Sequence, residues 1–548
     1  MNVVIIGGVA GGMSVATRLR RLDDDASIIV LERSAHVSYA NCGLPYYVGG
    51  VIDDEADLLL QTPASLHERF RIDVRVRSEA RHIDTTSRRV AVRDLATGHD
   101  YELEYDTLVL SPGASPIIPP IPGVERALPL RTVEDVERLH AVVSDLPRHA
   151  VVIGGGFIGV EVAENLMHRG IATTIVEAAP QLLAPLDPEM ASLVAEEVVR
   201  NGVSLYLDDA VATISAASVT LKSGTVVDAD LVVLAIGVRP EVSLARAAGL
   251  AIGPRGGIEV NGFNQTSEPR IYALGDAAEK MDALDGSATL VPLANIANRH
   301  GRLVADHVAG RDVRPRTTIA TAIVKVFDLT VATTGWNEKR LEAAGRRAVA
   351  IHTHPASHAG YYPGARPMSL KILVDPSSGA LLGAQGVGSD GVDKRIDVLA
   401  TALRGGISAP ELADLELAYA PPFGSAKDPV NMLGYVAENV LSGLERTIQW
   451  HEVDDYLARG ATLVDVRSRE EFERGSLPGA INIPVDELRE RRAEIDSSVI
   501  VVFCQVGQRG HVATQLLSRW GHTVRNLDGG YATWRHSPAF GEMTVASH

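Results

Sequence analysis

The chain carries one local pattern twice: a short apolar run, a cluster of glycines and then a segment of helical periodicity. The clusters are GGVAGG at residues 7–12 and GGGFIG at residues 154–159. A second apolar run follows each cluster and ends in a glutamate, Glu32 or Glu177, which lies 25 or 23 residues after the first glycine. A βαβ unit of this length, with glycines opening its helix, is typical of dinucleotide sites. The sequence therefore predicts two parallel-sheet nucleotide-binding units.

The second unit has the complete G-x-G-x-x-G pattern, formed by Gly154, Gly156 and Gly159. These glycines permit a tight turn and a close approach of the backbone to a pyrophosphate at the start of the helix. Glu177 is placed to accept hydrogen bonds from the adenosine ribose and to repel a 2′-phosphate. We therefore expect this unit to bind NADH in preference to NADPH.

The first unit departs from the full pattern at one position. Gly7 and Gly12 are in register, but Val9 stands at the second glycine. A valine adds bulk beside the pyrophosphate without excluding it. With Glu32 at the end of the next strand, this unit is predicted to bind a second dinucleotide.

Length and charge narrow the class of protein. The 548 residues suffice for about three or four domains, and 46% hydrophobic with 22% charged residues is typical of a globular α/β protein. The net charge of −17 disfavours a nucleic-acid partner. No apolar run approaches the roughly 18 residues that span a bilayer, and the N-terminus enters a strand without a basic leader. We expect a cytoplasmic protein with no membrane partner.

The chain has only two cysteines, Cys42 and Cys504. This number excludes a disulfide framework and a zinc site of four thiolates. The 17 histidines show no ligand spacing, so no metal is expected, and His300 and His511 are interpreted as ordinary surface or capping residues.

Composition shifts and strand patterns divide the chain into four domains. A proline-rich connector at residues 116–122 separates the two nucleotide-binding units. After about residue 316, alternating β-branched residues indicate an antiparallel sheet with helices, and a short α/β module follows from about residue 450. We expect these boundaries: 1–115 and 245–315 for the first nucleotide domain, 116–244 for the second, 316–445 for the α+β domain and 446–548 for the last.

The two units, with Gly275-Asp276 at a later strand end, resemble the two-dinucleotide-binding flavoprotein disulfide reductases. This resemblance implies two Rossmann-like domains, for FAD and NAD(P)H, and an α+β domain that forms a homodimer. It also implies that Glu32 holds the FAD ribose, with Arg33 beside it, and that Asp276 holds the ribityl chain. Gly113 would lie near the flavin.

Cys42 lies in the segment SYANCGLPYY, residues 38–47. A thiol between a loop of small residues and a predicted helix start is placed where a helix and a flavin would stabilise a thiolate. Most of the superfamily carries a cysteine pair, whereas this segment looks like the single-cysteine branch. That branch contains coenzyme A-disulfide reductases, NADH-dependent persulfide reductases, and NADH oxidases and peroxidases.

Two kinds of chemistry fit one thiolate beside a flavin. Peroxidases cycle the sulfur through a sulfenic acid, whereas reductases form a mixed disulfide with an exogenous thiol. The peroxidases of this family have a histidine in the first glycine turn, where this chain has Ala10. The substitution favours the disulfide chemistry.

Arg18 and Arg21 lie three residues apart on one face of the first helix, near the pyrophosphate turn. They are placed to bind an anionic thiol carrier such as coenzyme A, although two arginines also suit a solvated face. The resemblance implies that coenzyme A is held by these positions: Ser14, Arg18, Arg21, Ser38, Asn41 and Lys427. Asn298 stands where some of these reductases have a histidine. Tyr361 and Tyr419 would face Cys42 from the partner subunit and donate a proton to a departing thiolate, although packing at an interface would explain them equally well.

The last module has the loop CQVGQRG at residues 504–510 between an apolar strand and a helical pattern. We expect backbone N–H groups of this loop to converge on the sulfur of Cys504 and to hold a persulfide, with Arg509 adding positive charge. With DVR at 465–467 and LDGGYATW at 527–534, the module is similar to a single rhodanese domain.

The resemblance as a whole implies that NADH reduces FAD, and that the electrons pass to a mixed disulfide between Cys42 and coenzyme A. The substrate would be a coenzyme A persulfide, a polysulfide or coenzyme A disulfide, and Cys504 would relay sulfane sulfur. Two alternatives stay open: an NADH oxidase or peroxidase with a cysteine sulfenate, and a sulfurtransferase whose flavoprotein half only senses a dinucleotide.

Overall fold

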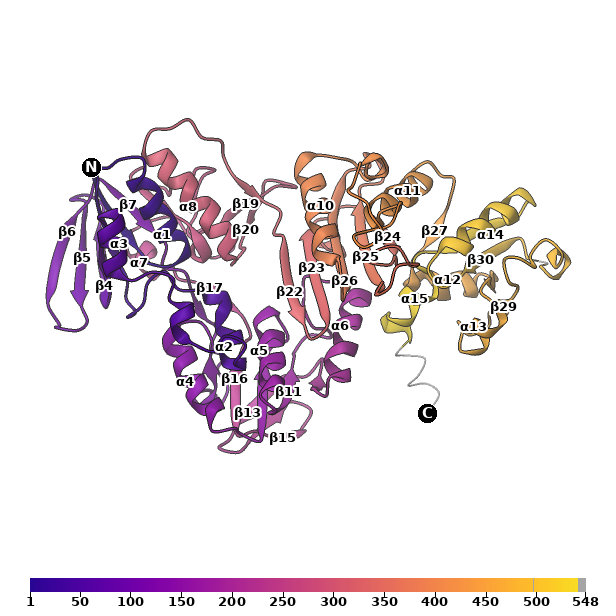
Figure 1. Cartoon of the computed structure of the whole chain (residues 1–548), viewed down its shortest axis with the longest axis horizontal. Coiled ribbons are helices and arrows are strands. Elements are labelled where there is room, and N and C mark those ends of the chain that lie inside the picture. Colours follow the sequence, from indigo (N-terminus) through magenta and orange to yellow (C-terminus); the bar gives the residue numbers. More distant parts are fainter. Residues whose placement is uncertain (496, 541–548) are drawn as a thin grey trace. The chain divides into compact units, whose positions relative to one another are not determined.

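The computed structural model describes residues 1–495 and 497–540 (Figure 1). They form two compact units: the first contains Met1–Pro180 and Gly202–Thr318, and the second contains Gln181–Asn201 and the chain from Ile319 onward. Each unit consists of sheets covered by helices, so the predicted α/β class is confirmed. Among the helices of the described residues, none combines the length and the apolar character that crossing a bilayer requires.

The first glycine cluster joins a strand to a helix in a five-stranded parallel sheet of order β18-β7-β1-β2-β3. These strands are β1 (Asn2–Ile6), β2 (Ser27–Leu31), β3 (Asp73–Arg75), β7 (Thr107–Leu110) and β18 (Ile271–Ala273). The helices beside them are α1 (Ala10–Arg20), α3 (Pro63–Phe70) and α8 (Ala294–Val308). Runs rich in valine and isoleucine form the strands because β-branched side chains suit a sheet buried on both faces.

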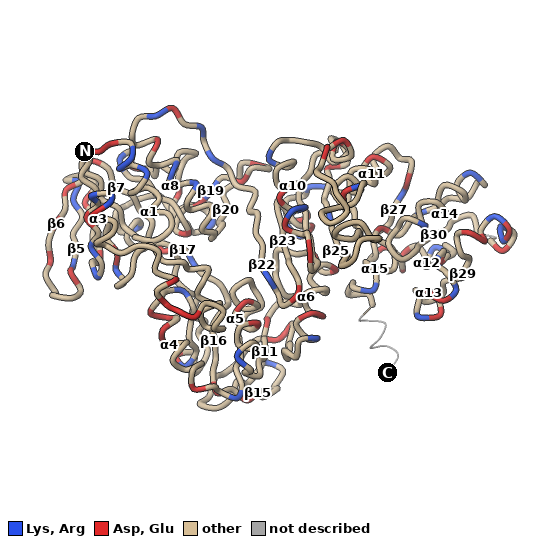
Figure 2. The backbone as a smooth tube through the Cα atoms, viewed as in Figure 1, with Lys and Arg blue, Asp and Glu red and all other residues tan. Residues whose placement is uncertain are grey.

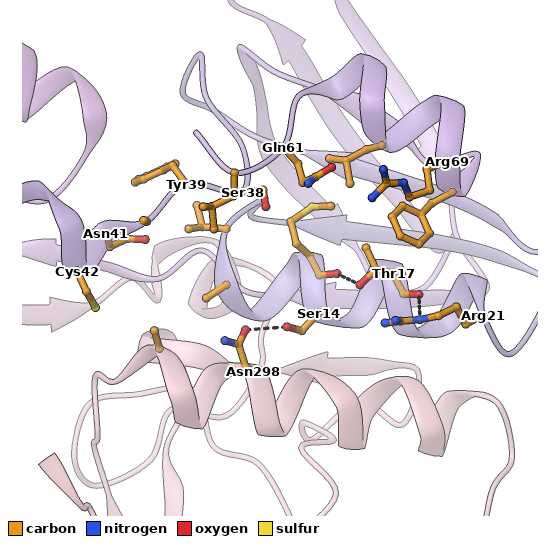
Figure 3. A pocket seen from close by; sticks show the side chains of 18 residues that line it. Ser14, Thr17, Arg21, Ser38, Tyr39, Asn41, Cys42, Gln61, Arg69 and Asn298 are labelled. Atoms are coloured by element: carbon orange, nitrogen blue, oxygen red, sulfur yellow. Dashed lines mark hydrogen bonds between the residues drawn. The ribbon is translucent and has the colours of Figure 1, made fainter. Parts of the chain in front are cut away.

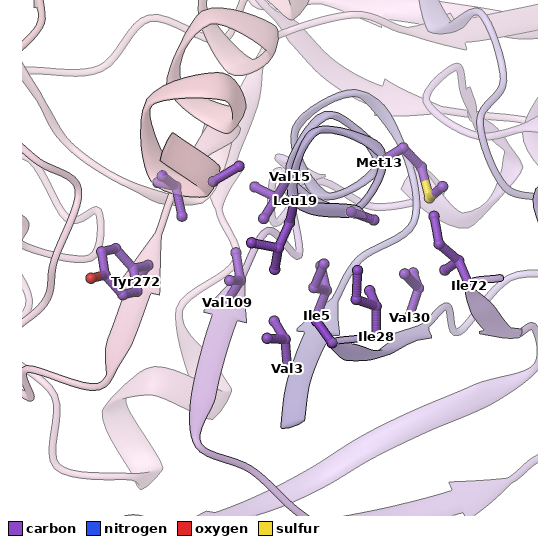
Figure 4. Close-up of a cluster of buried hydrophobic side chains, with 14 of the residues drawn as sticks. Val3, Ile5, Met13, Val15, Leu19, Ile28, Val30, Ile72, Val109 and Tyr272 are labelled. Carbon is purple, nitrogen blue, oxygen red and sulfur yellow. The ribbon is translucent and has the colours of Figure 1, made fainter. Parts of the chain in front are cut away.

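The core of this domain lies between α1 and the sheet (Figure 4). Helical spacing places Val15 and Leu19 on one buried face of α1, and Met13 is buried as well. The residues that form this core and are labelled in the figure are at most 6% exposed: Val3, Ile5, Met13, Val15, Leu19, Ile28, Val30, Ile72, Val109 and Tyr272. This packing fixes the start of α1, and with it the glycine turn.

The second glycine cluster lies in another parallel sheet, of order β12-β11-β10-β16-β9. Its strands are β9 (Leu128–Pro129), β10 (His149–Ile153), β11 (Ala172–Val176), β12 (Ser204–Tyr206) and β16 (Leu231–Leu234), with helices α4 (Val133–Ser144) and α5 (Phe157–His168). The remaining strands of the first unit are β4 (Ser78–Asp84), β5 (Arg89–Asp94), β6 (Asp100–Glu104), β8 (Ala114–Pro116), β13 (Val211–Ile214), β14 (Ser218–Leu221), β15 (Val226–Asp228), β17 (Val238–Pro240), β19 (Lys280–Asp282), β20 (Ala288–Thr289) and β21 (Thr317–Thr318). Its short helices are η1 (Asn41–Gly43), α2 (Leu44–Gly49), η2 (Glu55–Leu58), η3 (Val124–Arg126), α7 (Ser243–Ala247) and η4 (Gly275–Ala277).

The second unit begins with an antiparallel sheet of order β22-β23-β26-β25-β24, as expected for the α+β domain. The strands are β22 (Ala322–Val326), β23 (Leu329–Gly335), β24 (Val349–Thr353), β25 (Met368–Val374) and β26 (Leu381–Gly388). Its helices are α6 (Pro188–Arg200), α9 (Glu338–Ala343), α10 (Val392–Gly405), η5 (Pro410–Asp414) and α11 (Pro429–Leu441). Helix α6 follows β11 in the sequence yet packs on β22, β23 and β26.

The C-terminal domain is a parallel sheet of order β27-β31-β30-β28-β29. Its strands are β27 (Thr447–Ile448), β28 (Thr462–Asp465), β29 (Ile481–Asn482), β30 (Val499–Phe503) and β31 (Thr523–Leu527). The helices are η6 (Trp450–Glu452), α12 (Val453–Ala458), α13 (Arg469–Glu473), η7 (Arg492–Glu494), α14 (Gln508–Arg519) and α15 (Gly530–Arg535). Figure 2 shows basic and acidic residues interspersed along the described backbone of both units.

Candidate active site

A cleft of about 430 Å³ opens beside the first glycine turn (Figure 3). It is bounded by α1, by the loop that leads into η1, by α3 and by the first turns of α8. The structure thus brings together residues that are far apart in the sequence, such as Ser14 and Asn298, which are separated by 284 positions. The predicted residues that line the cleft are Ser14, Arg21, Ser38, Asn41, Cys42 and Asn298.

Cys42 lies on η1, at one end of the cleft, and α2 begins two residues later. The residue as a whole is exposed, although the surrounding protein partly desolvates its thiol. Partial burial of the thiol raises its pKa above the usual value, the Glu161 carboxylate raises it further, and Arg131 opposes both effects. The protein groups around Cys42 therefore do not by themselves favour the thiolate that the sequence predicts. Glu161 and Arg131 give no local signal in the sequence.

Two guanidinium groups, those of Arg21 and Arg69, lie at the other end of the cleft from Cys42 (Figure 3). Arg21 is held by a hydrogen bond from its Nε to the Thr17 carbonyl at 2.9 Å. Arg69 comes from α3 and was missed by the sequence analysis, because a basic residue near a helix end is common. The cleft can therefore hold a long molecule that is anionic at the end away from the thiol.

Arg18 does not line the cleft. Its guanidinium forms an ion pair with Asp306 on α8, with 2.7 Å between Nη2 and Oδ1. Ser14 and Asn298 connect the same two helices, since the Ser14 hydroxyl donates to Asn298 Oδ1 at 2.7 Å. One predicted arginine thus fastens α1 to α8, whereas the Ser14–Asn298 pair lies in the wall of the cleft.

The first glycine turn is fixed by a carboxylate. Gly7 has a φ of +104°, which a side chain would strain. Glu32 accepts hydrogen bonds from Gly8 N at 2.9 Å and from Ser34 N at 2.8 Å, so it joins the turn to the end of β2. A Cβ added at Gly12 would collide with the carbonyl of Gly7. Arg33 beside Glu32 is exposed.

Asp276 and Gly113 both lie beside the guanidinium group of Arg131. The Arg131 guanidinium pairs with Asp276, with 2.6 Å between Nη2 and Oδ2. The same Nη2 would lie 3.4 Å from a Cβ added at Gly113, whose φ is +77°. Two predicted flavin-contact positions are therefore brought together around a positive charge.

The second glycine turn repeats the arrangement of the first. Gly154 has a φ of +108°, and Glu177 accepts hydrogen bonds from Gly155 N at 2.6 Å and from Ala179 N at 2.7 Å. A Cβ at Gly156 would meet no atom within 4 Å, so space is open where α5 begins. Open space at a glycine turn before a twelve-residue helix fits a pyrophosphate. The residues present therefore suit a dinucleotide.

Tyr361 and Tyr419 lie in the second unit, and the structure places their hydroxyl oxygens 3.0 Å apart. Their side chains are 76% and 48% exposed, and Phe423 nearby in the sequence is 71% exposed. Lys427, in the same segment, is also exposed. The structure thus brings two predicted catalytic tyrosines into one exposed aromatic pair.

Cys504 follows β30 at the start of the loop that leads into α14. Gly507 N donates to its Sγ at 3.2 Å, as expected for a loop that cradles the sulfur. The residue is only 1% exposed. Arg509 binds Glu471 through two hydrogen bonds of 2.7 Å, and its guanidinium also interacts with Cys504.

The two histidines that the sequence suggests to be surface or capping residues, His511 and His300, differ in their exposure to solvent. His511 is partly exposed, and its Nδ1 lies 2.8 Å from Glu445 Oε2. The interpretation of His300 is wrong: it is 2% exposed on α8, and neither ring nitrogen has a hydrogen-bond partner among the described residues. Burial lowers its pKa to about 4, so the ring is neutral. A histidine on the buried face of a helix carries no signal that separates it from an exposed one.

Comparison with known protein families identifies the domains of the chain. Residues 1–301 match the pyridine nucleotide-disulphide oxidoreductase family, and residues 321–429 match the dimerisation domain of that family. Residues 449–537 match the rhodanese-like domain. The chain belongs to the pyridine nucleotide-disulfide oxidoreductases and carries a C-terminal rhodanese-like domain.

Three similar proteins show which members of this family the chain resembles. The reduced CoADR-RHD of Bacillus anthracis is 48% identical, with a TM-score of 0.96 over 98% of each chain. A NAD-dependent persulfide reductase from A. fulgidus is 38% identical, with a TM-score of 0.92 over 97% of this chain and all of that one. The coenzyme A disulfide reductase of Staphylococcus epidermidis is 33% identical over 439 residues, which are 80% of this chain and the whole of the relative.

Proposed function

We propose that this protein is an FAD-dependent reductase that uses NADH to reduce coenzyme A persulfide, a polysulfide or coenzyme A disulfide through Cys42. The observation that carries the proposal is the cleft with a thiol at one end and two guanidinium groups at the other. Coenzyme A has a thiol at one end and phosphates at the other, and guanidinium groups bind phosphate well. The similarity to a coenzyme A disulfide reductase and to a persulfide reductase supports this substrate class.

Cys42 acts as the nucleophile in this scheme. With coenzyme A disulfide or coenzyme A persulfide as the substrate, its thiolate attacks the S–S bond at the sulfur of coenzyme A and forms a mixed disulfide with coenzyme A. The leaving group is coenzyme A thiolate from the disulfide and hydrosulfide from the persulfide. Two electrons from NADH then cleave the mixed disulfide, and a proton is taken up by the departing coenzyme A thiolate. The sums are NADH + H⁺ + CoA–S–S–CoA → NAD⁺ + 2 CoA–SH, and NADH + H⁺ + CoA–S–SH → NAD⁺ + CoA–SH + H₂S.

The two glycine turns give each cofactor its place. Gly7, Gly12 and Glu32 would hold FAD, with Asp276 at the ribityl chain, and the turn at residues 154–159 would hold NADH. Bound FAD supplies two-electron redox chemistry between the nicotinamide and the sulfur. Glu177 fixes its turn through two backbone hydrogen bonds, and its negative charge at the end of β11 would repel the 2′-phosphate of NADPH, which supports a preference for NADH.

The tyrosine pair serves a second copy of the chain. We infer that the protein is a homodimer in which Tyr361 and Tyr419 reach the cleft of the partner subunit and protonate the departing thiolate. Their exposure and their contact through the hydroxyl groups support this role. Lys427, in the same exposed segment, would bind coenzyme A from the partner, and Ser14, Arg21, Ser38, Asn41 and Asn298 would bind it from the cleft.

Cys504 carries sulfane sulfur in the proposed scheme. Its loop offers a backbone N–H to the sulfur, and Arg509 lies in the first turn of α14, directly after this loop. A relay within one chain raises the effective concentration of the transferred sulfur at the reductase site. The domain boundaries given above and the cytoplasmic location stay predictions from the sequence.

The discriminating experiment is steady-state oxidation of NADH without oxygen, with each sulfur substrate supplied in turn. The proposal predicts turnover with coenzyme A persulfide, polysulfide or coenzyme A disulfide, and one sulfide or two thiols for each NADH. In a separate assay with oxygen or hydrogen peroxide as the oxidant, faster turnover would instead identify an oxidase or peroxidase, which Ala10 disfavours. Sulfur transfer without any NADH oxidation would identify a sulfurtransferase with a sensing flavoprotein half.

A further inference from the structure

The second unit contains a buried cluster of charged side chains that the proposed chemistry does not use. The ammonium of Lys371 on β25 lies among three carboxylates, 2.8 Å from Asp187 Oδ2, 2.5 Å from Glu189 Oε1 and 3.0 Å from Glu338 Oε2. Asp187 directly precedes α6. The side-chain amide of Gln385 on β26 donates a hydrogen bond to Asp187 Oδ2 at 2.6 Å. One ammonium group thus faces three carboxylates and neutralises only part of their negative charge. Glu189 also contacts a second basic side chain.

That partner is His352 on β24, which is 3% exposed. Its Nε2 lies 3.0 Å from Glu189 Oε1, and its Nδ1 lies 2.6 Å from Asp528 Oδ2. A carboxylate only accepts hydrogen bonds, so both ring nitrogens donate and the ring is an imidazolium. The two carboxylates outweigh the effect of burial and raise the pKa of His352 to about 9.

Asp528 belongs to the rhodanese-like domain, directly after β31. Both of its carboxylate oxygens accept a hydrogen bond from the backbone N–H of His352, at 3.2 and 3.0 Å. Gln449 Nε2 adds a further hydrogen bond to it at 3.2 Å. The position of this carboxylate is therefore set by the dimerisation domain as well as by its own strand.

The turn after Asp528 holds the sulfur-carrying loop. Tyr531 N donates to the carbonyl of Cys504 at 2.8 Å, and Ala532 N donates to the carbonyl of Gln505 at 2.9 Å. A Cβ added at Gly530 would collide with the same Cys504 carbonyl. The turn and the loop thus fit closely, and a shift of Asp528 moves the backbone that carries Cys504.

We propose that His352 is a positioning residue for Cys504: its contact with Asp528 fixes the turn that holds the Cys504 loop in the conformation that accepts sulfur. The inference rests on the proposed role of Cys504 as a sulfur carrier. Sulfur transfer by the rhodanese-like domain would then depend on His352, a residue of the dimerisation domain. His352 itself touches neither the sulfur nor a substrate. Small displacements of a reacting atom cost large factors in rate.

Two substitutions of His352 separate this role from a general loss of packing. His352→Asn keeps a donor near the place of Nδ1, toward Asp528, whereas His352→Gln keeps one near Nε2, toward Glu189. Both remove the ring and its charge, so a structural defect alone would affect them equally. The positioning role predicts that only the variant that keeps the contact with Asp528 retains fast sulfur loading.

The experiment follows sulfur addition to the Cys504 peptide of the full-length protein by mass spectrometry after mixing with thiosulfate or a polysulfide. His352→Gln should load at least about tenfold more slowly than the wild type, and His352→Asn within about threefold of it. NADH-driven reduction of coenzyme A disulfide should stay unchanged in both. Equal loading in His352→Gln and wild type, or an equal loss in the two variants, would overturn the inference.

A different result would overturn the proposed function and not this inference alone: wild-type Cys504 that acquires no sulfur from any donor. Should His352→Gln fail to fold, Asp528→Asn keeps the size of the side chain and weakens the same contact. It is expected to show the same slow loading with unchanged disulfide reduction, and wild-type loading in Asp528→Asn would contradict the inference.

Discussion

The hydroxyl of Tyr46 donates a hydrogen bond to Glu161 Oε1 at 3.2 Å, and so joins the helix that follows Cys42 to the helix of the second glycine turn. Burial raises the pKa of Glu161 to about 7, although the hydrogen bond from Tyr46 opposes this shift. The same carboxylate raises the pKa of Cys42. A carboxyl group with a pKa of about 7 therefore contributes, after burial, to the raised pKa of the nucleophile.

Replacing Glu161 with glutamine should make Cys42 more reactive at neutral pH. The change removes the negative charge that raises the pKa of the thiol, so the thiolate forms at lower pH. The measurement is the rate of iodoacetamide labelling of the Cys42 peptide against pH. Tyr46→Phe should act in the same direction, because loss of the hydrogen bond raises the pKa of Glu161 further. An unchanged or higher midpoint in Glu161→Gln would show that this carboxylate does not act on Cys42.

Glu177 should set the choice of nicotinamide. Stopped-flow measurement of flavin reduction is expected to be faster with NADH than with NADPH, and Glu177→Gln should reduce the difference by about tenfold or more, since hydrogen bonds to charged groups contribute roughly 1 to 3 kcal/mol. Equal reduction of the wild type by both nucleotides would remove this role from Glu177.

Cys504→Ser should abolish transfer of sulfane sulfur to a thiol acceptor and leave reduction of coenzyme A disulfide intact. Serine keeps the loop geometry but cannot form a persulfide. Donor-treated wild type should gain about 32 Da on the Cys504 peptide, the mass of one sulfur atom. If the added sulfur resides only on Cys42, the C-terminal domain does not carry sulfur.

The stability of the second unit should fall as pH rises above neutrality. The pKa of His352 rises from 6.5 to about 9 on folding, so the folded state binds the proton more tightly than the unfolded state between these values. The contribution of protonated His352 to the free energy of unfolding is therefore complete below pH 6.5 and is lost as pH rises through about 9. The groups facing the ring are Glu189, Asp528, Lys371 and His354. Thermal unfolding from pH 6 to 10 should show a steeper decline in wild type than in His352→Asn, and parallel curves would refute the charge on His352.

The local parts of the fold could be predicted from the sequence, because the signals for them are local. The glycine turns are required where φ is positive, as at Gly7 and Gly154. The strand before the Cys504 loop is a run of apolar residues, and the helix start after Cys42 follows from the small residues around it. Each of these features depends on residues that are neighbours in the chain.

The remaining parts depend on long-range contacts that leave no pattern in one sequence. The pairing of Arg18 with Asp306 spans 288 positions, and that of His352 with Asp528 spans 176. Arg69 reaches the cleft because α3 packs beside α1, which helical periodicity alone does not predict. Charged residues that are buried by their partners look like surface residues until the partners are known.

The most direct test of the proposed reductase is to follow coenzyme A on Cys42 itself. Oxidised coenzyme A should give a mixed disulfide on the Cys42 peptide of the wild type, seen by mass spectrometry, and NADH should remove it with release of coenzyme A. Cys42→Ser should still pass electrons from NADH to bound FAD, yet form no adduct and reduce neither coenzyme A disulfide nor persulfide. Near wild-type release of thiol or sulfide by Cys42→Ser would contradict the account, because the electrons would then not pass through this residue.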